Sequence, residues 1–351
     1  MSKQDLRFTW HYDHKDTFDP PPSDQPVTVY ADPGPTQPSD DECICYFGKE
    51  RGAAGLRMTP NARNYTLILQ PPASDHPIFT AWYGQEPALT IESGTVFYDS
   101  SLNKSSLFVI DNASPITIGE GGRLRIGALE GGDIHYSDDF SEAQGRIFTL
   151  SHDGSFEVEV NDGSASHESN FILSDTARMT TSGRGVVFHN ATFTLKDSAK
   201  LTATGRADNL LIFENKTSIS LQDQSVVEIY SDEPFFDSSR GSSFTLNNAS
   251  ATLSFFPLTK TADPFDFGKN RYPKALFNFI KDQDHFNQSR VFIPGMELRA
   301  ACLRQAMLQD QVLAINGTIT QDSELIDHKT ETINTPHGPC YGTWIFLRKK
   351  P

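Results

Sequence analysis

No stretch of this sequence approaches the ~18 consecutive apolar residues that a membrane-spanning helix requires. The first ten residues also lack the apolar segment and the small-residue cleavage site of a secretory signal peptide. We therefore expect no membrane insertion. The locations that fit are the cytoplasm, a virion, or a compartment reached by an export route that needs no signal peptide.

Cysteine is scarce, with four residues in a chain of 351. Cys43 and Cys45 are too close together in an extended segment to bridge comfortably, and Cys302 and Cys340 are isolated. No C-x-x-C pair is present, which argues against a zinc site. We expect reduced thiols, and a pairing of Cys45 with Cys340 is the alternative that the sequence leaves open.

Basic residues are outnumbered, with 30 Lys and Arg against 45 Asp and Glu and a net charge of −15. This balance disfavours non-specific binding to nucleic acid or to an anionic membrane surface. Neutral or basic partners fit better. The same acidity also keeps exposed strands from associating, so it does not by itself indicate a partner.

The sequence does contain a repeat, centred on the segment from Phe171 to Met179. An apolar residue recurs at intervals of 22 to 32 residues, and a second large apolar residue precedes it by two positions in every copy. Apolar residues at alternate positions are typical of a strand with one buried face. The recurring pairs are Leu89 and Ile91, Ile116 and Ile118, Phe148 and Leu150, Phe171 and Leu173, Phe193 and Leu195, Ile219 and Leu221, and Phe244 and Leu246.

A bend follows each of these strands. A polar residue such as Asp175, Asp197 or Asp223 comes next, then a small residue, then a fresh apolar position. This order indicates a strand, a tight bend and a second strand, and the run from Leu210 to Phe213 reads as a third strand. Each copy thus predicts a three-stranded coil of about 22 to 26 residues, stacked ~4.8 Å from the next.

The repeated L-x-D-x-A-x-L pattern resembles the coils of right-handed parallel β-helices, an architecture shared by pectate lyases, phage tailspikes and adhesin passenger domains. The resemblance covers roughly residues 85 to 256. It implies an all-β solenoid, but not a function, because this architecture hosts both enzymes and binding surfaces. We expect a Pro-rich, irregular N-terminal segment over 1–60, the parallel β-helix over 61–256 and an aromatic-rich C-terminal cap over 257–351.

The cap region carries signals of its own. After Pro294 a partly helical period predicts one short amphipathic helix. The Asn316-Gly317 pair between apolar runs predicts a hairpin over 312–319. A final strand is expected over 341–347.

The interval between Ile118 and Leu150 is the longest, and its excess residues predict a projecting loop over 127–146. The loop combines carboxylates, a histidine and aromatic rings, a mixture that suits sugars or basic peptides. As a solvated loop its acidic residues would need no such role. The candidate binding residues are Glu130, Asp133, His135, Tyr136, Asp138, Asp139 and Phe140.

The aspartate column at the bends has two interpretations. The carboxylates could accept hydrogen bonds from nearby backbone N–H groups in Asx-turns, or they could bind calcium. We favour the first and expect no metal or other cofactor. His11 and His14 lack supporting ligands and do not indicate a metal site.

Eight Asn-x-Ser/Thr sequons occur, and we attribute them to the turn preferences of their residues rather than to glycosylation. They begin at Asn64, Asn103, Asn112, Asn190, Asn215, Asn248, Asn287 and Asn316.

The strings typical of polygalacturonase-like enzymes, N-T-D, G-H-D and R-I-K, are absent, and no cluster of aspartates with an arginine resembles the pectate lyase site. The first interpretation is therefore a non-catalytic, adhesion-like recognition surface for a glycan or protein partner. A polysaccharide-cleaving hydrolase or lyase of the tailspike type is the second, and a structural rod or spike subunit is the third.

Overall fold

The computed structural model describes most of the chain in 19 segments, and all structural statements below concern these residues. They are residues 6–9, 15–32, 36–38, 43–47, 55–71, 73, 78–83, 89–103, 106–111, 115–127, 134–138, 147–160, 163–237, 241–247, 250–259, 265–269, 271–281, 286–295 and 300–349. The chain forms two compact units, Met1–Ile172 with Thr176–Arg184 and Leu173–Asp175 with Gly185–Pro351.

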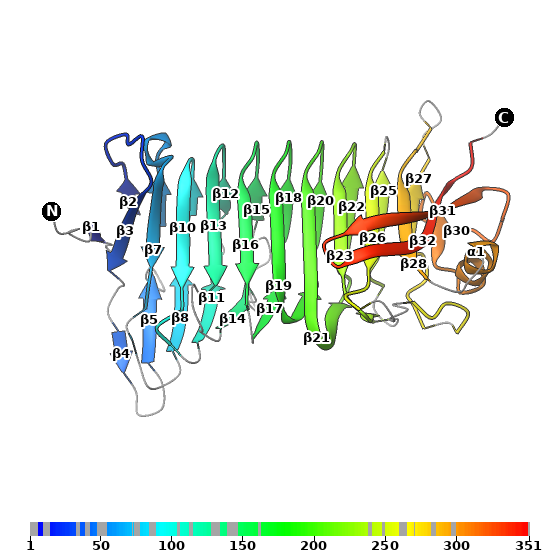
Figure 1. Ribbon diagram of the computed structural model, residues 1–351, viewed down its shortest axis with the longest axis horizontal. Helices are drawn as coiled ribbons and strands as arrows, with labels where there is room; N and C mark the ends of the chain where they lie inside the picture. Colours follow the sequence, from blue (N-terminus) through cyan, green and yellow to red (C-terminus); the bar gives the residue numbers. More distant parts are fainter. Residues whose placement is uncertain are drawn as a thin grey trace. The chain divides into compact units, whose positions relative to one another are not determined.

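The first unit consists of parallel strands that stack in three series (Figure 1). The first series contains β2 (Lys15–Phe18), β6 (Gly55–Met58), β9 (Leu89–Ile91), β12 (Ile116–Ile118), β15 (Ile147–Leu150) and β18 (Asn170–Leu173). The second contains β1 (Leu6–Thr9), β3 (Val27–Asp32), β7 (Tyr65–Leu69), β10 (Gly94–Asp99), β13 (Gly122–Gly127), β16 (Ser155–Glu159) and the start of β19 (Arg178–His189). The third contains β5 (Cys43–Phe47), β8 (Ile78–Tyr83), β11 (Ser106–Asp111), β14 (Ile134–Ser137) and β17 (Ser164–His167), and the short β4 (Thr36–Pro38) pairs antiparallel with β5.

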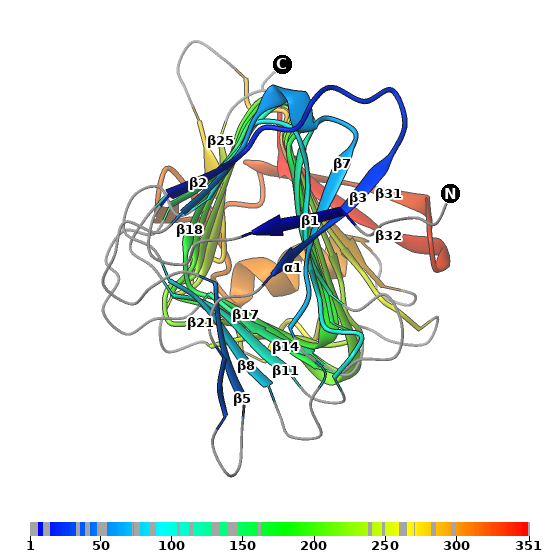
Figure 2. The same cartoon turned by 90° about the vertical axis from the view of Figure 1, so that its left-hand side faces the viewer.

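These coils wind in a right-handed sense. Viewed from the N-terminal end, the first series lies on the left, the second on the right and the third below (Figure 2). The chain visits the series in that order and recedes from the viewer, which is a clockwise, right-handed path. The predicted right-handed parallel β-helix is therefore confirmed as the architecture of this unit.

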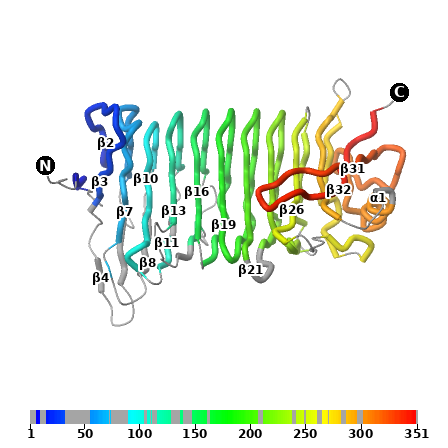
Figure 3. Tube along the Cα trace, in the orientation of Figure 1, coloured from blue at the N-terminus to red at the C-terminus, as the bar shows by residue number. Residues whose placement is uncertain are grey.

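The second unit repeats the same arrangement, with one series made of β20 (Thr192–Leu195), β22 (Ser218–Gln222), β25 (Ser243–Asn247), β27 (Phe277–Ile280) and β29 (Leu313–Ile315). Its neighbour contains β21 (Lys200–Glu214), β23 (Val226–Tyr230), β26 (Thr252–Phe256) and β28 (Arg290–Pro294). The last residues of β21 pair with β24 (Pro234–Phe236), so the predicted third strand is the final part of one long strand. Figure 3 traces the successive coils of the chain as a tube.

The predicted interior ladder is present in each unit. In the first, Ile116 pairs with Phe148, and the rings of Phe148 and Phe171 stack with centroids 4.8 Å apart. In the second, Ile219 pairs with both Phe193 and Phe244. All six side chains are at most 2% exposed, so the first apolar residue of each recurring pair forms part of the core.

The bend aspartates adopt the left-handed backbone conformation, with φ of 58° at Asp175, 54° at Asp197 and 55° at Asp223. Their carboxylates do accept backbone N–H groups, as expected, but those groups belong to another coil. Asp197 Oδ2 accepts the N–H of Asp175 at 3.0 Å, and Asp223 Oδ2 accepts the N–H of Asp197 at 3.2 Å. The column therefore links successive bends, which a local Asx-turn would not do.

Parallel pairing starts earlier than the predicted boundary at residue 61. Asp16 pairs with Leu56, which pairs with Leu89 of the predicted repeat. The three consecutive prolines from Pro20 to Pro22 lie between β2 and β3, where no ladder N–H is needed. The N-terminal segment thus combines irregular stretches with strands that continue the coils.

Parallel pairing also extends beyond residue 256. Phe277 pairs with Phe244 and Phe279 with Leu246, so these two aromatic residues continue the interior ladder rather than belonging to the cap. The predicted helix is α1 (Ala300–Gln309), and the predicted hairpin is formed by β29 and β30 (Thr318–Ile319). Asn316 and Gly317 form its turn with φ of 50° and 74°.

A longer antiparallel hairpin closes the chain. β31 (Ile326–Thr335) pairs with β32 (Gly338–Leu347), which pairs in turn with β28. β32 contains the predicted final strand, whereas β31 was not predicted from the sequence. The hairpin lies across the outer face of β23 and β26 (Figure 1), and its residues pack against Tyr230, Phe256 and Phe292.

Cys302 and Cys340 are free thiols, so the alternative pairing of Cys340 with Cys45 is absent. Within the segments described above, no helix is long and apolar enough to cross a membrane.

Candidate functional site

Most of the predicted binding loop lies outside the described residues. This applies to Glu130, Asp133, Asp139 and Phe140. His135 lies in β14, but its side chain is not among the described groups. The loop hypothesis is therefore neither supported nor excluded by these five positions.

The other two predicted binding residues lie in the interior and not on the surface of the predicted loop. Tyr136 and Asp138 are each 1% exposed. Tyr136 packs its ring 5.4 Å from the imidazole of His167, and its hydroxyl donates to Asp138 Oδ2 at 3.1 Å. Ser169 N–H donates to the other carboxylate oxygen at 3.1 Å. Asp138 is consequently occupied by the protein's own donors.

The buried network contains the types of side chain found in a catalytic triad, but a substrate cannot reach it. His167 Nδ1 lies 2.8 Å from Asp138 Oδ2, and His167 Nε2 lies 3.0 Å from Thr181 Oγ1. A carboxylate, an imidazole and a hydroxyl in this order could activate a nucleophile. Thr181 and His167 are fully buried, however, so no substrate reaches the hydroxyl. The network therefore stabilises the fold.

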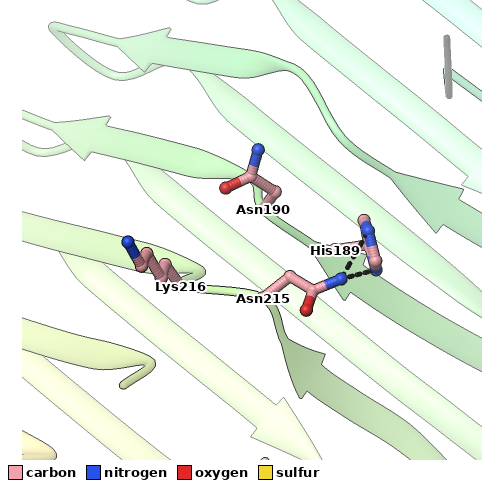
Figure 4. A pocket seen from close by; sticks show the side chains of 4 residues that line it. All are labelled: His189, Asn190, Asn215 and Lys216. Atoms are coloured by element: carbon pink, nitrogen blue, oxygen red, sulfur yellow. Dashed lines mark hydrogen bonds between the residues drawn. The ribbon is translucent and has the colours of Figure 1, made fainter. Parts of the chain in front are cut away.

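A surface pocket of about 330 Å³ lies on the flank of the second unit (Figure 4). It is formed where β19 and β21 end, because both strands run into a bend at the same edge of the sheet. The described residues that line it all carry a polar group, and they are His189, Asn190, Asn215 and Lys216.

The imidazole of His189 is held from two sides. Its Nδ1 lies 2.8 Å from Glu214 Oε1, and the amide nitrogen of Asn215 lies 2.6 Å from its Nε2. With the proton on Nδ1, the ring donates to the carboxylate and accepts from the amide. This arrangement fixes the ring orientation while leaving about a third of the His189 side chain exposed, 32%.

The bends present the remaining groups to solvent. Asn190, Asn215 and Lys216 have φ of 55°, 51° and 70°, a conformation that asparagine tolerates better than most residues. The bends at Asp175, Asp197 and Asp223 use the same conformation, so the backbone alone does not mark a site. The exposed side chains of Asn190 and Lys216 have no hydrogen-bond or ion-pair partner among the described residues.

An exposed aromatic ring lies on β24, the strand that pairs with the end of β21. Phe235 of β24 is 55% exposed and pairs with Ile212 of β21, two residues before Glu214. Side chains two residues apart on a strand lie on the same face, so Ile212, Phe235 and Glu214 share the outer surface. An exposed aromatic ring therefore lies on the same outer face as Glu214, the carboxylate that contacts His189.

The sequence did contain a signal for this site. His189 and Glu214 are 25 residues apart, which is about one coil, and the Asn190 and Asn215 sequons have the same spacing. We interpreted those asparagines as turn residues only, which accounts for their backbone conformation but not for the pocket that they line.

The described residues contain no group of three or more His, Cys, Asp or Glu side chains able to hold a metal ion. His11 and His14 lie outside that part of the chain. Comparison of the chain with protein-family models, with curated proteins and with solved structures found no match.

Proposed function

We propose that this protein is a non-catalytic recognition surface that binds a glycan on the flank of the second unit. The observation that supports this most directly is the exposed ring of Phe235 on the strand paired with the end of β21, where two asparagines, a histidine and a lysine line a pocket. Sugars combine an apolar ring face with closely spaced hydroxyl groups. An aromatic surface next to fixed amide groups is complementary to both features.

The free hydrogen-bonding capacity of the pocket agrees with this proposal. A sugar hydroxyl both donates and accepts, and the Asn190 amide offers one acceptor and two donors. Lys216 adds up to three donors on a flexible stem. Because neither side chain is engaged within the described protein, a ligand would not have to displace an existing bond.

The test is a glycan array followed by calorimetric titration of the best glycan. Phe235→Ala is expected to weaken binding about 3- to 10-fold, the effect of losing ~0.5–1.5 kcal/mol of ring contact. Asn190→Asp keeps a residue that tolerates the positive φ of this bend but removes the two amide donors, so it should weaken binding without changing the melting temperature. Tyr341→Ala is the matched control, since Tyr341 is an exposed ring of the same unit, 44% exposed, outside the pocket lining. Equal affinity of the Phe235 and Tyr341 variants would contradict the proposal.

The second candidate, cleavage of a polysaccharide, is favoured by one specific arrangement. The N–H of Asp237 donates to the Phe213 carbonyl, which puts Asp237 beside Glu214 on adjacent strands ~4.8 Å apart. Retaining glycosidases use two carboxyl groups ~5 Å apart, and adjacent positions on paired strands are a placement from which such a pair can form. The engagement of Glu214 by His189 argues for a structural role instead.

A reducing-end assay separates the two functions. The recognition proposal expects no new reducing ends after prolonged incubation with a bound polysaccharide. If reducing ends appear and are lost in both Glu214→Gln and Asp237→Asn, the protein is an enzyme and the non-catalytic proposal fails.

A further inference from the structure

A second pocket lies in the C-terminal part of the second unit and is separate from the one beside His189. Its volume is about 520 Å³. One wall is the outer face of α1, and the other is the segment between β30 and β31. Its lining comprises one cation, one apolar side chain and four neutral polar groups, namely Arg304, Leu308, Gln305, Gln309, Gln321 and Ser323.

Arg304 is fixed but not neutralised. Its Nη1 donates to the Ile326 carbonyl at 3.1 Å, which anchors the guanidinium at the pocket wall. A guanidinium has five N–H donors, so most of the donors of Arg304 remain available. No carboxylate lies within ion-pair distance of Arg304 among the described residues.

The acidic side chains nearby in the sequence are already engaged elsewhere. Glu324 and Asp327 approach Arg348 at 2.8 and 3.8 Å, and Asp322 accepts the N–H of Glu324 at 2.8 Å. Arg304 thus carries an uncompensated positive charge, although the chain as a whole has a net charge of −15. Its planar group is suited to pairing with a carboxylate through two parallel hydrogen bonds.

The neutral side chains of the pocket further limit which chemical groups the ligand can carry. Gln305, Gln309 and Gln321 each offer both donors and an acceptor, and Ser323 adds a hydroxyl. Groups of this kind match hydroxyls, which also donate and accept. Leu308 is 6% exposed and contributes a small apolar contact. The size is in the range of small-molecule pockets of about 300–1,000 Å³.

We propose that this pocket binds a carboxylate carried by a polyhydroxylated compound, that is, a sugar acid, with Arg304 as the carboxylate partner. The carboxylate pairs with the free edge of the guanidinium, and the glutamine amides hydrogen-bond the hydroxyls. This site is independent of the glycan site proposed above, because the two share no residue.

The experiment uses the full chain and three probes: glucuronate, glucose, which lacks the carboxylate, and acetate, which lacks the hydroxyls. Binding is followed by the NMR signal of the Arg304 Nε–H group and by calorimetry. Glucuronate is expected to shift this signal and to bind more tightly than either partial probe. Arg304→Gln should weaken glucuronate binding about 10-fold or more, the usual effect of losing a charged hydrogen-bond partner.

Two further variants separate binding from folding. Arg304→Lys keeps the charge but loses the planar pair of donors, so its affinity should lie between those of the wild type and Arg304→Gln. Gln321→Ala changes an exposed side chain and should weaken glucuronate binding without changing the melting temperature. Lys216→Ala, at the other pocket, should leave glucuronate binding at Arg304 unchanged.

Three outcomes would overturn the proposal: no shift of the Arg304 signal at millimolar glucuronate, equal binding of glucose and glucuronate, or full glucuronate affinity in Arg304→Gln. None of them depends on whether the pocket beside His189 binds a glycan. Failure of that first proposal would appear instead as unchanged glycan affinity in Phe235→Ala.

Discussion

His167 Nδ1 and Asp138 Oδ2 lie 2.8 Å apart, and both side chains are completely shielded from solvent. The carboxylate also accepts the Ser169 N–H and the Tyr136 hydroxyl, and the other ring nitrogen of His167 contacts the Thr181 hydroxyl. A buried polar group is costly unless its hydrogen bonds are made. The network therefore stabilises the first unit only as a whole.

Asp138→Ala is expected to lower the free energy of unfolding by about 3–5 kcal/mol, because removal of one partner leaves buried donors unsatisfied. Denaturant unfolding followed by circular dichroism measures this. Glu120→Gln, which alters an exposed side chain, is the control and should stay within about 0.5 kcal/mol of the wild type. A loss of similar size in both variants would refute the special role of the network.

The bend aspartates can be tested by separating backbone conformation from charge. Asp197→Asn retains an acceptor oxygen and a residue that tolerates positive φ, so little loss is expected. Asp197→Ala loses both features and should destabilise by about 1–3 kcal/mol. The comparison requires unfolding curves of both variants. If Asn were as harmful as Ala, the negative charge itself would be needed, and an ion at the column would have to be reconsidered.

Cys340 provides a prediction on pH. Burial raises the pKa of its thiol to about 11, whereas Cys302 is exposed. Alkylation at pH 9 followed by peptide mass spectrometry should modify Cys302 and spare Cys340 in the folded protein. Since the folded-state pKa lies above the ordinary value, the Cys340 contribution to stability is complete below that value and is lost as pH rises through about 11. Rapid modification of Cys340 at pH 9 would show that the terminal hairpin opens.

The attachment of that hairpin depends on Gly342. A Cβ atom placed on Gly342 would lie 2.6 Å from the Ile293 carbonyl oxygen and would overlap the Phe292 ring. Gly342→Ala should therefore separate β32 from β28 and expose Trp344, which a red shift of tryptophan fluorescence would report. Gly295→Ala is the matched control, because nothing lies within 4 Å of its Cβ position. An unchanged spectrum of Gly342→Ala would argue against the close packing.

The coils were predictable because their signal is repeated. Residues such as Phe148 and Phe171 recur at the same place relative to a bend, so many weak local preferences add up to one architecture. The Asn316-Gly317 hairpin was predictable for the opposite reason, since its turn requires these two residues locally. The β31–β32 hairpin belongs to neither class, because it is outside the repeat and its pairing is determined by packing on Tyr230 and Phe292.

The candidate sites were harder to predict from the sequence than the coils. Asp138 follows a short strand beside a long insertion, where the sequence does not determine which side chains face inward. Its partner His167 is 29 residues away and becomes a neighbour only through stacking of coils. His189 and Glu214 are brought together in the same way, 25 residues apart. In a solenoid, the polar residues that form a site become neighbours only when the coils are aligned. The apolar ladder makes this alignment possible, but it does not show which polar residues form a site.

The carboxylates of Asp197 and Asp223 each accept the amide N–H of the preceding bend aspartate, so the same connection links Asp175 to Asp197 and Asp197 to Asp223. Any whole coil that begins and ends at such an aspartate offers the same donor on one side and the same acceptor on the other. Gene duplication or deletion of one complete turn would therefore rejoin matching surfaces, so the second unit can gain or lose length in evolution, or by design, in steps of a single coil.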